Sequence, residues 1–202
     1  VFLSVAQAQE ADGNRDVAAA RESFDHGLRP RMSHAERAGY LRAIGRNLGE
    51  RATDIARAWP NEMGILYGMA QGAAAGLGSV YDYYAGLAET YPFYERRVPG
   101  PTAGGGVGLL IREPVGVVAT IVAWNGAPVM IAYKSAPALL AGCTVIVKTS
   151  PEAPSAGYIM AEVCEAVGMP PGVVNVITAD RAASERLVRH VGIDKTSFTG
   201  SS

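Results

Sequence analysis

The carboxyl-terminal half of the sequence alternates short apolar runs with segments of helical periodicity, and this alternation restricts the possible folds more than any other feature. The first run, residues 115–123, lies between Pro114 and Asn125 and is typical of a strand buried on both faces. Further strands are expected at 144–148, 173–177 and 195–199, and helices at 129–140, 153–167 and 182–190. The pattern predicts an α/β fold in which residues 115–202 form a Rossmann-like parallel sheet with helices on both faces, incomplete at its carboxyl end.

The preceding residues, 1–91, are predicted to form an amino-terminal helical segment. Apolar spacing indicates helices at 16–26 and 65–90. A capping-box pattern from Ser33 to Glu36 begins another helix between them.

Glycine and proline divide the rest of this half. Pro60 and Gly64 are expected to interrupt the chain before the last of these helices. Residues 92–114 are rich in both residue types and are predicted to form connecting and oligomerisation strands, one of them at 107–111. The glycines at 104–106 do not fit the phosphate-loop motif GxxxxGK[ST], because no lysine follows. They do not fit GxGxxG either, because Leu109 stands in place of the third glycine. A flexible turn is therefore expected there.

Two apolar features of this half favour structural rather than functional roles. Residues 1–5 are expected to form a strand entering the fold, because the run is too short and lacks the basic start of a signal peptide. Tyr81, Tyr83 and Tyr84 are expected to pack in the protein rather than to form a stacking platform.

Composition excludes several classes of partner. Hydrophobic residues make up 49% of the chain and charged residues 18%, which is typical of a folded globular protein. The net charge is -1 and the basic residues are scattered, so neither nucleic acid nor membrane is expected as a partner. Cys143 and Cys164 have neither metal-site nor disulfide spacing, which predicts no metal and a reducing, cytoplasmic location. Both cysteines are expected to be structural.

Ligands of a parallel sheet bind at the carboxyl ends of its strands. The loops that should meet at this edge are Trp124–Asn125, Lys148–Glu152, Thr178–Asp180 and Gly200–Ser201.

The residues of these loops leave alternatives open. Lys148 suits the hydroxyls of a ribose, but a surface lysine beside a helix cap explains it equally well. Asn125 can donate to a developing oxyanion, although a turn-forming Asn before Gly126 is the simpler interpretation. Gly200 and Ser201 stand where a helix should begin and its free N–H groups could bind phosphate.

The sequence closely resembles the aldehyde dehydrogenase family along nearly its entire length. The blocks that carry the resemblance, in the family's order and spacing, are Glu113–Val118, Trp124–Asn125, Lys134, Ala136–Leu139, Ala141–Thr144, Lys148, Pro170–Asn175 and Phe198–Ser201.

The resemblance implies roles for individual residues. Asn125 would hydrogen-bond the aldehyde oxygen and the oxyanion, and Lys134 would lie near the reactive centre, in a proton path. Lys148 would contact the adenosine ribose, and Gly200 and Ser201 would open the pyrophosphate-binding helix. The full set of cofactor-binding residues expected is Ile121, Val122, Ala123, Trp124, Lys148, Ser150, Pro151, Glu152, Ala179, Gly200 and Ser201.

Two departures from the family pattern leave the cofactor open between NAD and NADP. Many members have a glutamate three residues after the lysine, where this sequence has Pro151, with Glu152 one position later. Many also have a glycine in the loop where this sequence reads Thr178-Ala179-Asp180, so the adenine contacts are expected to differ.

The implied activity is NAD(P)-dependent oxidation of a small-molecule aldehyde to a carboxylic acid through a cysteine thioester. The family's catalytic cysteine and glutamate are expected beyond Ser202, so residues 1–202 alone are predicted to be inactive. A homodimer or homotetramer is implied, assembled partly through strands resembling 107–112. The alternative function is a non-catalytic nucleotide-binding or assembly module. An acylating variant that transfers the thioester to coenzyme A also stays open.

Overall fold

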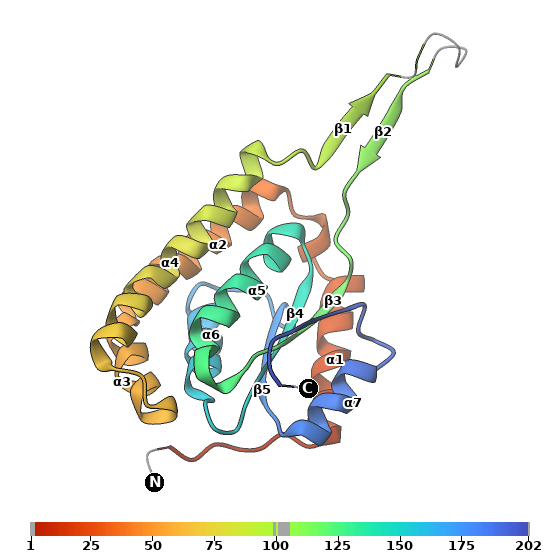
Figure 1. Cartoon of the computed structure of the whole chain (residues 1–202). Coiled ribbons are helices and arrows are strands. Elements are labelled where there is room, and N and C mark those ends of the chain that lie inside the picture. Colours follow the sequence, from red (N-terminus) through yellow and green to blue (C-terminus); the bar gives the residue numbers. More distant parts are fainter. Residues whose placement is uncertain (1–2, 99, 101–105, 202) are drawn as a thin grey trace.

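The computed structural model describes residues 3–98, 100 and 106–201. Helices α1 to α4 form the amino-terminal part, a β-hairpin follows them, and the remaining strands and helices alternate (Figure 1). The elements span α1 Glu10–Asp25, η1 Arg29–Arg31, α2 His34–Glu50, α3 Ala52–Met63, α4 Tyr67–Thr90, β1 Tyr94–Arg97, β2 Gly108–Ile111, β3 Val117–Ile121, η3 Trp124–Gly126, α5 Ala127–Ala141, β4 Thr144–Thr149, α6 Ser155–Ala166, β5 Val174–Thr178, α7 Arg181–Arg189 and β6 Lys195–Phe198.

The described residues form a central parallel sheet with the strand order β5-β4-β3-β6. Strands β3, β4 and β5 follow one another outward, and the chain then returns to place β6 against the other side of β3. The register pairs Ile121 with both Lys148 and Phe198, so the carboxyl ends of these strands align at one edge. The predicted α/β fold with a parallel sheet is confirmed, and the strand order reverses between β3 and β6.

Alternating side chains divide the buried residues between the two faces of the sheet. Val145 and Val147 of β4 belong to the core beneath α5 and α6, which α2, α3 and α4 extend outward. Ile146 belongs to the opposite core, where α1 and α7 contribute Val17 and Leu187. A sheet covered on both faces requires apolar side chains at consecutive positions, which explains the uninterrupted apolar runs of the sequence.

A buried guanidinium joins the amino-terminal helices to the end of α5. Arg37 is 4% exposed, and its Nη1 and Nη2 donate to the carbonyl oxygens of Ala141 and Pro30, each at 2.8 Å. Carbonyl groups at a helix carboxyl end carry partial negative charge, which stabilises a cation there. Gly142 ends α5 with φ of 101°, and a Cβ built there would lie 2.5 Å from Arg37 Cζ. Glycine is therefore required between this helix end and the arginine.

The β1–β2 hairpin projects away from the sheet (Figure 1). Its strands pair antiparallel with Tyr94 opposite Ile111, and at its base the His34 ring stacks on Phe93 with centroids 3.6 Å apart. The hairpin region exposes Tyr94, Val98, Val107, Leu109, Leu110 and Ile111. The turn predicted at 104–106 lies outside the described residues except for Gly106. Exposed apolar side chains on unpaired strand edges are typical of a surface that contacts another chain.

The strand expected at residues 1–5 is wrong for residues 3–5, which have no regular secondary structure. The segment before α1 instead reaches the carboxyl end of β5. The Ala8 N–H donates to the Thr178 carbonyl oxygen at 2.7 Å, and Gln7 Nε2 donates to Asp180 Oδ2 at 2.9 Å. A single backbone hydrogen bond among the described residues does not extend the ladder, so the segment is not a strand.

Helix α3 was not expected from the sequence, and neither were the bounds of β1 within the strands predicted for residues 92–114. Pro60 lies in the last turn of α3, where it removes one helical hydrogen bond shortly before the helix ends at Gly64 with φ of 78°. The buried side chains of Ile55 and Trp59 stabilise the helix despite this loss. Strand β1 has the charged sequence YERR and lacks the apolar pattern by which strands are predicted.

The remaining expectations concern tyrosines and cysteines. Tyr81 is fully buried and Tyr84 packs against the core, as predicted. Tyr83 is 65% exposed and packs edge-on against the Tyr84 ring, with centroids 5.2 Å apart. Cys143 and Cys164 are both free and buried, and Cys143 directly precedes β4. Cys143 therefore lies at the edge of the sheet opposite the strand ends that a ligand would meet.

Asp16 of α1 makes the stability of the protein depend on pH. Burial, and then the carboxylate of Asp12, raises its pKa from 3.8 to about 6, while Arg15 lowers it. Its Oδ2 is buried with no hydrogen-bond partner in the described part of the chain. The folded state therefore binds the proton more tightly than the unfolded state. The stabilisation by this proton is complete below about pH 4 and is lost as the pH rises through about 6.

Asp16→Asn is expected to increase the free energy of unfolding at pH 7.5 by about 1 kcal/mol. This is less than the roughly 3 kcal/mol of a two-unit pKa shift, because the side chain is partly exposed. Denaturant unfolding from pH 7.5 to about pH 4.5 should show the difference from the wild type shrinking. Asp82→Asn, which changes an exposed carboxylate of α4, is the control. A difference that is constant over this range would contradict the assignment.

Candidate functional site

A cleft of about 1070 Å³ opens at the carboxyl edge of the sheet, where the strand order reverses. Ligands of doubly wound sheets bind at this position, in the crevice outside the carboxyl ends of the strands. The cleft is lined by Ile121, Val122, Ala123, Trp124, Asn125, Met130, Lys148, Ser150, Pro151, Glu152, Ala179, Asp180, Arg181, Ser184, Glu185, Val188, Arg189, Phe198, Thr199, Gly200 and Ser201.

The chain leaving β3 supplies the first wall of the cleft. Ile121 and Val122 are buried, and Trp124 and Asn125 of the short η3 helix are exposed toward solvent. The indole Nε1 of Trp59 donates to the Asn125 carbonyl oxygen at 3.2 Å, which ties this turn to α3. Because the backbone of Asn125 is held in this way, its side-chain amide is positioned at the mouth of the cleft.

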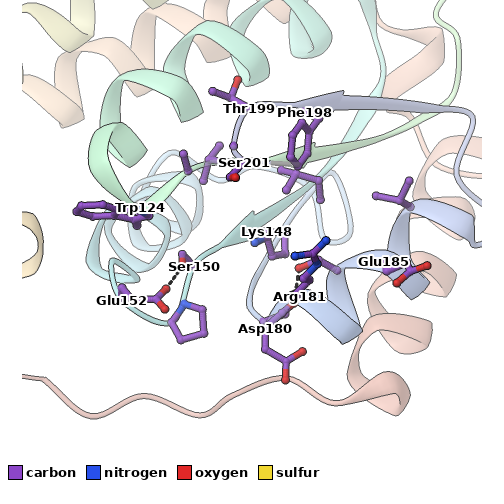
Figure 2. A pocket seen from close by; sticks show the side chains of 18 of the residues that line it. Trp124, Lys148, Ser150, Glu152, Asp180, Arg181, Glu185, Phe198, Thr199 and Ser201 are labelled. Carbon is purple, nitrogen blue, oxygen red and sulfur yellow. Dashed lines mark hydrogen bonds between the residues drawn. The ribbon is translucent and has the colours of Figure 1, made fainter.

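Lys148 brings a buried cation to the floor of the cleft (Figure 2). Its side chain is 7% exposed and lies between its register partners, Ile121 and Ile177. Burial lowers the pKa of its ammonium group, and the carboxylates of Glu152 and Asp180 oppose this effect. Within the described residues no acceptor forms a hydrogen bond with Lys148. An ammonium buried in this way is available to a ligand.

The loop after β4 supplies a hydroxyl and a carboxylate. The Ser150 hydroxyl donates to Glu152 Oε2, and this hydrogen bond is the main reason that the pKa of Glu152 is lowered. Figure 2 shows both side chains at the rim, on the side of Lys148 that faces Trp124. Pro151 lies between them, and the carboxylate stands four residues after Lys148.

The exits of β5 and β6 complete the edge. Ala179 is fully buried, and its N–H donates to the Thr149 carbonyl oxygen at 3.2 Å. The Thr199 N–H donates to the carbonyl oxygen of Ile121 at 3.1 Å, which directs Gly200 and Ser201 into the cleft. Glycine at this position leaves the backbone N–H groups accessible to a phosphate.

All of the predicted site residues except Lys134 line this one cleft. Lys134 of α5 lies instead beside β6, where its Nζ donates to Ser197 Oγ at 2.9 Å, and burial lowers its pKa. Sequence reasoning missed Met130 and the whole contribution of α7. That contribution comprises Arg181, Ser184, Glu185, Val188 and Arg189. Helical spacing puts most of these α7 residues on one stripe, a signal that the sequence contains.

The composition of the cleft fits a nicotinamide dinucleotide. Its volume exceeds the roughly 300–1,000 Å³ typical of small-molecule sites. A buried ammonium, a hydroxyl and a glycine-led chain segment occupy one edge and offer donors to the phosphate and ribose groups of such a ligand. Over the same described residues, no cluster of three or more His, Cys, Asp or Glu is arranged to hold a metal ion. None of the described helices combines the length and apolar character that crossing a membrane requires.

The fold and the cleft together define a doubly wound α/β domain of the nucleotide-binding type. The sequence model of the aldehyde dehydrogenase family matches residues 1–202, and the chain belongs to this family. Geranial dehydrogenase from Castellaniella defragrans is 39% identical over 199 residues, which cover 98% of this chain and 41% of that enzyme. Aldehyde dehydrogenase 1 from Tanacetum cinerariifolium is 34% identical over 206 residues, covering 100% and 40%.

Solved structures agree with this membership. The crystal structure of Mycobacterium tuberculosis aldehyde dehydrogenase complexed with NAD+ matches with a TM-score of 0.91 at 36% identity, covering 98% of this chain and 40% of that one. The Bacillus cereus aldehyde dehydrogenase in its NAD+ complex matches with a TM-score of 0.90 at 32% identity, with the same coverage of 98% and 40%. The chain therefore spans about two fifths of the length of these relatives.

Proposed function

We propose that the full-length protein containing this chain is an NAD(P)-dependent aldehyde dehydrogenase, and that residues 1–202 supply most of its dinucleotide-binding cleft and its oxyanion-stabilising amide. One observation carries the proposal: Asn125, Lys148 and Gly200 come from three different strand ends and line the same cleft. Family membership and the NAD+ complexes of similar structures support it.

Lys148, with the Ser150 hydroxyl, holds the adenosine ribose in this proposal. The backbone at Gly200 and Ser201 holds the pyrophosphate, and Ile121 to Trp124 form the wall on which the dinucleotide rests. The residues Pro151, Glu152 and Ala179 surround the adenosine end. When bound, NAD(P) supplies the hydride acceptor of the reaction.

Asn125 donates its amide N–H to the aldehyde oxygen and stabilises the negative charge that develops there. Neither Cys143 nor Cys164 is assigned as the nucleophile, because both are buried and neither lines the cleft. The thiol that forms the thioester and the glutamate that activates water are therefore assigned to residues outside 1–202. In this proposal, a protein made of residues 1–202 alone does not oxidise aldehydes. Lys134 is assigned a supporting role in proton movement, through its contact with Ser197.

The hairpin is proposed to contribute to a homodimer or homotetramer, because its exposed apolar residues and strand edges offer a surface for a second copy. A cytoplasmic location is proposed on the two free, buried cysteines, which are typical of proteins in reducing compartments. The proposed substrate is a small-molecule aldehyde.

Lys148→Met is expected to weaken binding of NAD(P) to the full-length protein about 10-fold or more, because the apolar stem is kept while a charge-assisted contact is lost. Isothermal titration calorimetry measures the affinity, and formation of NAD(P)H with a panel of aldehydes measures activity. The control is Lys195→Met, an exposed lysine at the start of β6 and so at the opposite edge of the sheet.

Equal affinities of Lys148→Met and the control would refute the assignment of Lys148. If the full-length protein bound the dinucleotide but oxidised no aldehyde, the non-catalytic nucleotide-binding module would replace the proposed enzyme.

A further inference from the structure

Arg181 brings a second cation to the same rim, and none of the roles above uses it. It is the first residue of α7, and its side chain lines the cleft. Figure 2 shows it directed toward Lys148, while the neighbouring Asp180 side chain points away toward the amino-terminal segment.

The register of the sheet explains why these two cations share one side. Lys148 is paired with Ile121 and Ile177, whose side chains belong to the core that α1 and α7 cover. Only Ala179 and Asp180 separate the end of β5 from α7. The ammonium of Lys148 therefore emerges on the face of the sheet where α7 begins.

The charges of Lys148 and Arg181 are not neutralised by ion pairs within the described chain. Neither forms a salt bridge there, although Glu152 and Asp180 act on Lys148 at longer range. The carboxylate of Asp180 accepts instead from the Ala183 N–H at 2.9 Å and from the Gln7 amide.

The other arginine of the cleft differs from Arg181 in this respect. Arg189 Nη2 lies 2.9 Å from Glu185 Oε1, so its charge is already paired. The cleft lining holds three basic and three acidic side chains, and its two cations without an ion pair in the described chain, Lys148 and Arg181, lie where α7 meets the end of β4.

We propose that Arg181 and Lys148 together bind the phosphate on the adenosine ribose of NADP, so that the cleft prefers NADP to NAD. The inference rests on the proposed function, which places the adenosine ribose at Lys148. An arginine fork matches two phosphate oxygens, and a lysine ammonium adds a point charge. Glu152 opposes this binding by charge, but its carboxylate accepts a hydrogen bond from Ser150.

The test measures the affinities of NADP+, NAD+ and the probe 2′,5′-ADP for the full-length protein by calorimetry. The wild type is expected to bind NADP+ about 10-fold more tightly than NAD+, and Arg181→Ala to weaken NADP+ and 2′,5′-ADP about 10-fold while NAD+ changes less than about twofold. Arg186→Ala removes the same charge from the same helix outside the cleft, and no selective loss is expected. Arg181→Lys should keep part of the preference.

Tighter binding of NAD+ than NADP+ by the wild type would overturn this inference and leave the proposed function standing. An equal loss of both dinucleotides in Arg181→Ala would also overturn it, because the arginine would then contact the part that they share. Binding of neither dinucleotide by the wild type would overturn the proposed function itself. Melting temperatures equal to the wild type exclude misfolding as the cause of a loss.

Discussion

Asn125→Ala is expected to lower kcat for aldehyde oxidation by the full-length protein about 10²–10³-fold, with the affinity for the dinucleotide changed less than about twofold. In the proposed function the amide of Asn125 donates to the charge that develops on the aldehyde oxygen, and such a donor acts mainly in the transition state. Asn125→Asp should be at least as damaging, because it keeps the size of the side chain but offers only acceptors at neutral pH.

Steady-state kinetics with a short aliphatic aldehyde measure this effect, and calorimetry measures cofactor affinity separately. Asn61→Ala is the matched control, since Asn61 is an exposed amide of α3 that donates to its own helix. An unchanged kcat in Asn125→Ala would contradict the oxyanion role. Asn125 would then serve only to form the turn before Gly126.

Gly142→Ala is expected to lower the free energy of unfolding by about 2–5 kcal/mol. A residue with a Cβ loses roughly 1–2 kcal/mol in the left-handed conformation at φ of 101°. Overpacking against the buried guanidinium of Arg37 adds about 1–3 kcal/mol, because its carbonyl contacts leave it little freedom to move.

Gly168→Ala separates these two contributions. Gly168 follows α6 with φ of 68°, and a Cβ built there would meet nothing within 4 Å. It should therefore show only the conformational cost, about 1 kcal/mol. Chemical denaturation measures the free energy of unfolding of both variants. Equal losses would show that the Arg37 side chain moves aside for the added methyl group without a further cost.

The sheet could be predicted because burial on both faces leaves a local pattern in the sequence. The run at 144–148 was expected and β4 spans Thr144–Thr149, since every residue of that strand is buried. Helix α3 could not be predicted in the same way, because its stability comes from the tertiary burial of Ile55 and Trp59, which outweighs the local effect of Pro60. The strand order also depends on packing between distant segments, so it cannot be predicted from the sequence of any one strand.

The same distinction holds for the site. Lys148 and Asn125 could be placed on one rim, because the carboxyl ends of parallel strands share an edge. The family resemblance then decided between their alternative interpretations. Arg181 could not be placed there, since the face of α7 that meets the cleft depends on how the helix lies on the sheet. The spacing of Arg181, Ser184 and Val188 places them on one face of the helix, but it does not show which part of the protein this face contacts.

The contact of Gln7 with Asp180 has a consequence for biosynthesis. These residues are 173 positions apart, so Gln7 is synthesised well before its partner Asp180. At a translation rate of roughly 5–20 residues per second, the delay is about 10–35 s. During that interval the segment before α1 stays without this native contact, and the edge of the cleft at Asp180 is completed only when the later residues are made.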